Sequence, residues 1–163
     1  MLTREEFLEA YHVREALEAL AARRASELLD DGDIVALEAL HEEMRRAVRD
    51  KAVQRFFDAN QRFHLSLVAL SGNGRLIDLH AQLIHRMGRY MARSLSLRGN
   101  LERSLGEHRD IIDALRSRDA DRAAAAVGLH IHVPQSSTEQ IPDEIFDTMD
   151  TGPEERGADV LPA

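Results

Sequence analysis

The sequence predicts an all-α protein, an antiparallel bundle of about six helices. Ala, Leu, Glu and Arg, which favour helices, dominate its 163 residues, whereas only 9 are Gly and 4 are Pro. Apolar residues recur at the three- and four-residue spacing of a helix, and no segment has the alternation of a strand. Short polar breaks separate the helical segments, which favours antiparallel neighbours.

Side-chain caps delimit the first two helices. Thr3 followed by Glu6 is a capping box, so a helix is predicted to begin there and to run to about Leu29. The segment Asp30-Asp31-Gly32-Asp33 breaks this helix and supplies caps for the next. The apolar residues expected to face the core are Phe7, Tyr11, Leu17, Leu20, Ala21 and Leu28 in the first helix, and Ile34, Leu37, Leu40, Met44 and Val48 in the second.

Four more helices are predicted, at about residues 53–71, 75–96, 100–118 and 120–132. Ser71-Gly72-Asn73-Gly74 ends the first of them, because glycine suits the left-handed position after a helix. Asp119 is expected to cap the last helix and Pro134 to end it. The expected inward residues are Phe56, Phe63, Leu67, Leu76, Leu79, Leu83, Met87, Tyr90, Met91, Ile111, Ile112 and Leu115.

The composition changes near residue 134. Residues 1–133 are predicted to form one helical domain, and residues 134–163 a disordered acidic tail rich in Ser, Thr, Pro and Gly. The alternative is an arm that docks on a partner subunit through the segment around Ile145-Phe146-Met149.

Charge and composition also exclude several classes of protein. The chain has no cysteine, which excludes disulfides and thiolate sites. It has neither the apolar run of a signal peptide nor a stretch that could span a bilayer, so we expect a cytoplasmic protein that does not bind membranes. The net charge of −8 opposes direct binding of nucleic acid.

Polar residues on apolar helix faces are candidates for a functional site. Asn60 and His64 are spaced i, i+4 on one face, while His108 and His130 lie on the apolar faces of two later helices. Imidazoles and an amide oxygen suit a divalent metal, zinc or nickel above all, with open positions for a small organic acid. Spacing alone does not select this set, since His80 also follows an apolar face and fits equally well as a hydrogen-bonded core histidine.

Four motifs then occur in order between residues 7 and 132. They are Tyr11-His12-Val13-Arg14-Glu15-Ala16-Leu17-Glu18, then Asn60-Gln61-Arg62-Phe63-His64 with Ser71-Gly72-Asn73, then Glu107 to Leu115 followed by Asp119, and finally Ala123 to His130. With them the chain resembles the effector-binding C-terminal (FCD) domain of GntR-family bacterial transcriptional regulators, in the FadR-type branch.

The resemblance implies a ligand-sensing and dimerisation domain that binds a small carboxylate effector at a divalent metal. It places the metal ligands at Asn60, His64, His108 and His130, and leaves His80 out. Many relatives have Asp where this chain has Asn60, so the site is expected to be less anionic and to bind its ion more weakly. A homodimer is expected, and the winged helix-turn-helix of full-length relatives is expected to have no counterpart before the first helix.

Three questions stay open at this level. Arg14 either binds the carboxylate of the effector or pairs with Glu18, four residues on in the same helix. The chain is predicted not to be an enzyme, although three histidines and an open position also suit a metalloenzyme built in a bundle. The other alternative is a stand-alone interaction module that forms heterodimers with an intact regulator.

Overall fold

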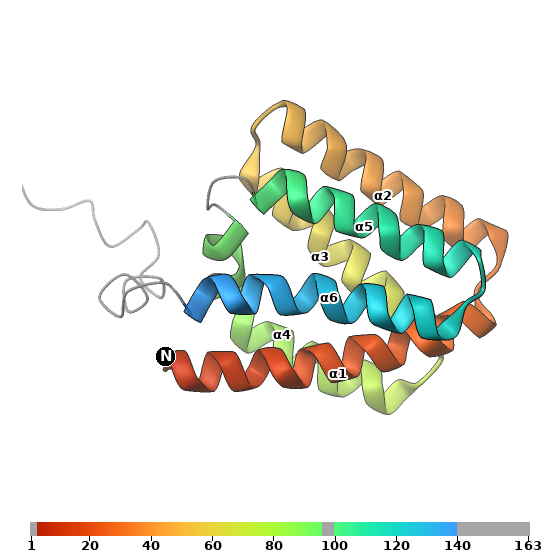
Figure 1. Ribbon diagram of the computed structural model, residues 1–163, viewed down its shortest axis with the longest axis horizontal. Helices are drawn as coiled ribbons and strands as arrows, with labels where there is room; N and C mark the ends of the chain where they lie inside the picture. The colour runs from red at the N-terminus through yellow and green to blue at the C-terminus, as the bar shows by residue number, and fades with distance from the viewer. Residues whose placement is uncertain (1–2, 96–99, 140–163) are drawn as a thin grey trace, which may run out of the picture.

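A computed structural model of the chain describes residues 3–95 and 100–139. Side chains are described for these residues except 89–90, 92–95 and 133–139. The described part is all-helical, as predicted (Figure 1). Its helices are α1 (Arg4–Leu28), α2 (Asp31–Arg49), α3 (Val53–Leu70), α4 (Gly74–Leu95), α5 (Asn100–Arg116) and α6 (Ala120–Glu139).

The predicted signals set the helix ends. Thr3 and Glu6 form the expected capping box of α1, and Asp30 and Asp33 form a second one that starts α2. After α3 the chain turns at Gly72, whose φ of 61° lies in the left-handed region that glycine adopts without a steric cost.

Helices that follow one another in the sequence run in opposite directions across the bundle (Figure 1). The packing also joins distant parts of the chain, because α1 lies along α6, and α2 lies against both α3 and α5. The largest fully buried side chains of the core are Phe7, Tyr11, Leu37, Met44, Phe56, Phe63, Leu67, Met87, Ile111, Ile112 and Leu115.

The inward face of α1 differs from the predicted one. Leu20 and Leu28 are 45% and 58% exposed, so the prediction that they face the core was wrong. The buried face of α1 instead passes through Arg14 and Glu18, at helical spacing from Tyr11. The prediction for Leu79 in α4 was also wrong, since it is 56% exposed, and the side chain of Tyr90 lies outside the described residues.

The end of α6 also differs from the prediction. The helix does not stop near His132 but continues through Pro134 to Glu139. A proline removes one backbone hydrogen bond and bends a helix, but the turns on either side can still form. Residues 140–163, which include the segment 145–149, lie outside the described residues. No helix in the described part is both long and apolar enough to cross a membrane.

Candidate metal centre

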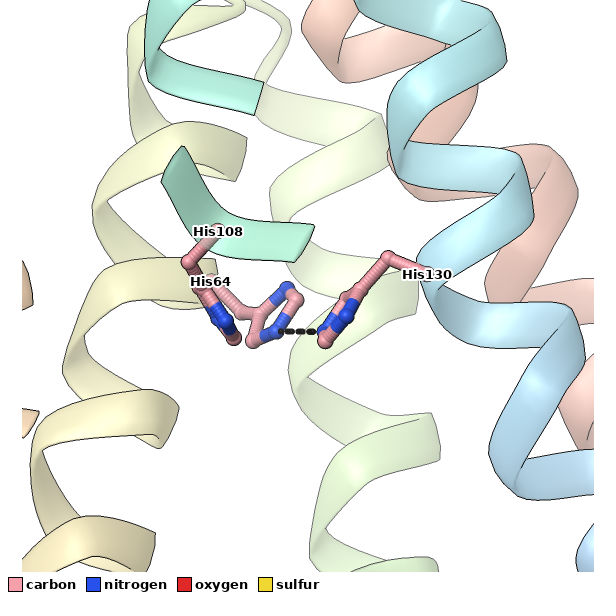
Figure 2. Close-up of side chains that lie close together, drawn as sticks. All are labelled: His64, His108 and His130. Carbon is pink, nitrogen blue, oxygen red and sulfur yellow. Dashed lines mark hydrogen bonds between the residues drawn. The ribbon is translucent and has the colours of Figure 1, made fainter. Parts of the chain in front are cut away.

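Three predicted ligands meet in the interior of the bundle. His64 on α3, His108 on α5 and His130 on α6 each offer one ring nitrogen, and these nitrogens all lie within 4.8 Å of one another. All three side chains are buried. Figure 2 shows the three rings grouped together, with the Nε2 atoms of His64 and His130 3.1 Å apart.

The opposite nitrogen of each ring is held by an acceptor. His64 Nδ1 lies 2.5 Å from Glu18 Oε2, and His108 Nδ1 lies 2.6 Å from the backbone oxygen of Ser104. His130 Nδ1 lies 2.8 Å from Glu107 Oε2. A carbonyl or an ionised carboxylate can only accept, so the hydrogens of His64 and His108 lie on Nδ1. Burial raises the pKa of Glu107, the guanidinium of Arg103 opposes this shift, and the ionised form of Glu107 likewise places the hydrogen of His130 on Nδ1. With the hydrogens on Nδ1, the Nε2 lone pairs of His64 and His130 face each other across the 3.1 Å contact drawn in Figure 2 with no hydrogen between them, and Nε2 of His108 has no partner.

Burial keeps these imidazoles neutral. Desolvation lowers the pKa of His64, and it lowers the pKa of His108 and His130 well below the usual range. The neighbouring histidines and, for His64 and His130, the guanidinium of Arg14 lower these pKa values further. Neutral rings are the form that binds a metal ion.

Two buried atoms here have no hydrogen-bond partner. They are Nε2 of His108 and Oδ1 of Asn60, which lies one helical turn before His64. A buried polar atom without a partner is destabilising, and such atoms are rare in folded proteins. Two nitrogens that each bind one zinc ion at about 2.1 Å lie roughly 3.0–3.4 Å apart, which matches the separation between His64 and His130. The residues present therefore fit a divalent metal ion.

Glu18 is a site residue that sequence reasoning missed. Its carboxylate is fully buried, and it contacts Arg14 Nε at 2.7 Å, His80 Nε2 at 2.8 Å and His64 Nδ1. Burial by itself would raise the pKa of Glu18, but the guanidinium of Arg14 and the hydrogen bonds from His64 and His80 outweigh it and hold this pKa well below the usual range. Glu18 is thus a buried anion, and the usable signal was its helical spacing from Tyr11 and Arg14.

The structure shows the contacts of Arg14 and His80, for which the sequence left alternatives open. Of the two arrangements considered for Arg14, the structure contains the pair with Glu18, with both side chains buried. His80 is a hydrogen-bonded core histidine, because its Nε2 contacts Glu18 and its ring is not among those that meet at the cluster. The second acid that sequence reasoning did not assign is Glu107, which adjoins His108 in sequence but contacts His130.

Comparison with known proteins identifies the domain. The family model of the FCD domain matches residues 9–133. The chain belongs to the FCD domain family, which is homologous to GntR-family regulators.

Individual relatives agree with this family. The HTH-type transcriptional repressor RspR of Escherichia coli K12 is 28% identical over 135 residues, as is the uncharacterised HTH-type regulator YdfH of Shigella flexneri. Each match covers 83% of this chain and 59% of the relative, so this chain spans less than two thirds of the length of these proteins.

Solved structures share the fold. E. coli McbR/YncC superposes with a TM-score of 0.74 at 21% identity, over 81% of this chain and 63% of that one. Lar, which controls the expression of the agr system of Listeria monocytogenes, gives 0.76 at 16% identity, over 87% and 67%. A GntR protein of Streptococcus agalactiae gives 0.67 at 24% identity, over 80% and 58%.

The lowered histidine pKa values predict how stability depends on pH. Between the folded-state values and the unfolded value of about 6.5, the unfolded chain binds more protons than the folded one. The free energy of unfolding of the metal-free protein should therefore decrease as pH falls below about 6.5, and Glu18 should extend the loss below about pH 4.5. Urea unfolding in the presence of EDTA, between about pH 7.5 and 5, measures this free energy of unfolding. A constant or rising stability over this range would contradict the assignment of three neutral buried rings.

Proposed function

We propose that this FCD domain senses a small carboxylate effector at a divalent metal ion, as the ligand-binding and dimerisation part of a GntR/FadR-type regulator. Zinc or nickel is the proposed metal, and Asn60, His64, His108 and His130 are the proposed ligands. The observation that carries the proposal is the set of three buried Nε2 atoms that face one another while each Nδ1 is held by an acceptor.

The donor set favours borderline divalent ions. Imidazole nitrogen suits zinc and nickel, whereas magnesium and calcium prefer oxygen donors. Glu18 and Glu107 each accept a hydrogen bond from the Nδ1 of a proposed ligand histidine. Such a hydrogen bond fixes the orientation of the ring and raises the basicity of its other nitrogen. Three rings and one amide oxygen leave positions on an octahedral ion for exogenous oxygen ligands.

The charge of the site favours an anionic effector. All four proposed ligands are neutral, so a bound divalent ion keeps its full charge. The carboxylates of Glu18 and Glu107 do not offset that charge, because the guanidinium groups of Arg14 and Arg103 pair with them. A carboxylate that completes the coordination would supply the missing negative charge.

Binding, rather than catalysis, suits the two acids beside the site. Glu18 and Glu107 each contact the Nδ1 of a histidine, the side of the ring away from the cluster. A general base would have to reach a water molecule bound on the open side of the metal. The curated relatives are transcriptional regulators, which agrees with a role without turnover.

The rest of the proposed regulator follows from the relatives. They are HTH-type proteins longer than this chain, and a reader of two half-sites requires two copies. We therefore expect a homodimer in which the effector shifts the FCD domains between two conformations and so changes the placement of DNA-reading heads. This chain itself is not expected to contact DNA.

The metal assignment predicts the effect of removing two histidines. The variant His108→Ala/His130→Ala should lose bound zinc or nickel, because one imidazole and one amide oxygen cannot hold the ion. Elemental analysis and native mass spectrometry of the purified protein measure the metal, and the latter also reports the expected dimer. The matched control is His12→Ala/His85→Ala, which removes two exposed histidines and should keep the metal. Equal metal content in the two variants would overturn the site.

The effector assignment predicts that small carboxylates bind at the metal. Cobalt(II) can replace zinc in such sites, and its visible absorption reports a change of ligand. Titration of the cobalt-loaded protein with lactate, citrate or acetate should shift this spectrum, whereas the uncharged analogue lactamide should have a weaker effect. A spectrum that none of these acids changes would contradict direct coordination of a carboxylate.

A further inference from the structure

The three rings of the cluster are anchored in different ways. His108 is held by Ser104 of its own helix α5, and His130 of α6 is held by Glu107 of α5. These two contacts stay within the α5–α6 pair. His64 of α3 is held instead by Glu18, which belongs to α1.

Glu18 connects three helices through one carboxylate. Its Oε2 faces His64 on α3, and its Oε1 faces both Arg14 on α1 and His80 on α4. The side chains of Arg14, His64 and His80 are buried as well. A buried carboxylate is stable only while its charge is paired and its oxygens accept hydrogen bonds. The position of Glu18 therefore depends on all three helices.

We propose that Glu18 is the positioning residue that couples metal occupancy to α1 and α4. It fixes the hydrogen of His64 on Nδ1 and so leaves the lone pair of Nε2 for the ion. When the ion is bound, His64 is a better donor to Glu18, and this contact strengthens the hold of Glu18 on α1 and α4. The inference rests on the proposed metal site, but its test can fail separately.

A single substitution should move the ring hydrogen of His64 from Nδ1 to Nε2. In Glu18→Gln, one end of the side chain becomes an NH2 group, which can only donate. That group cannot face Arg14, because a guanidinium has no acceptor, so it turns toward His64. The ring of His64 must then accept at Nδ1, which places its hydrogen on Nε2 and removes the lone pair from the metal position.

The first experiment measures this reversal in the metal-free protein. Nitrogen-15 NMR of histidine-labelled protein distinguishes the two ring tautomers, and His64 should carry its hydrogen on Nδ1 in the wild type and on Nε2 in Glu18→Gln. Affinity for zinc, measured by competition with a chelating dye, should fall by about 10- to 100-fold in this variant. The matched control is Glu15→Gln, which changes a half-buried acid of the same helix and should alter neither result.

The outcomes distinguish failure of the proposed metal site from failure of the proposed role of Glu18. If the wild type binds no metal, the proposed function fails, while the NMR result still decides the role of Glu18. If Glu18→Gln keeps the wild-type tautomer and binds zinc within about twofold of the wild type, the positioning role is wrong. That result would leave the metal site itself intact.

Hydrogen exchange of the wild type gives an independent test, which also decides the matter should Glu18→Gln fail to fold. Zinc should slow amide exchange in α1 near Glu18 and in α4 near His80, as well as in α3, α5 and α6 around the ligands. The helix α2 contributes no residue to the cluster or to its Glu18 contacts and is the internal control. Protection confined to α3, α5 and α6 would overturn the proposed coupling.

Discussion

A buried carboxylate imposes a strict condition on a helical core, and Glu18 meets it. The charge cannot be solvated where it lies, so it must be balanced and its oxygens must accept hydrogen bonds. Arg14 supplies the balancing charge, and His64 and His80 supply the remaining donors. The inner face of α1, the tautomer of His64 and the contact between α1 and α4 all follow from this requirement.

The same condition divides the site into a neutral part and a charged part. The charged groups, Glu18 and Arg14, form a balanced pair behind His64. The nitrogens that meet at the cluster belong to neutral rings, and the amide oxygen of Asn60 is the fourth proposed ligand and is neutral as well. An arrangement of this kind would hold a divalent cation without cancelling its charge, and the ion would then be able to attract an anion.

Local signals in the sequence sufficed for most of the fold. The two capping boxes and Gly72 act within a few residues of where they occur, so the helices they begin or end could be predicted. Asn60 and His64 were predictable as neighbours because a helix fixes their spacing. The meeting of His64 with His108 and His130 depended on how α3, α5 and α6 pack, and the resemblance to a known family supplied that knowledge.

The failures share one physical origin, which is the influence of distant parts of the chain. Leu20 and Leu28 were expected to face the core, but α1 is rotated so that Glu18, which pairs with Arg14, contacts histidines of α3 and α4. Glu107 was not assigned from the sequence, because the histidine that it contacts, His130, lies on another helix, α6. At Pro134 a local rule predicted an end that α6 does not have.

The central claim is that three Nε2 lone pairs converge on one ion. X-ray absorption spectroscopy of the zinc- or nickel-loaded protein tests it most directly, because the spectrum reports the number, type and distance of the ligands. The account predicts three imidazole nitrogens at about 2.0–2.1 Å together with oxygen donors. A shell of oxygen ligands alone, or one with fewer than three imidazoles, would contradict it.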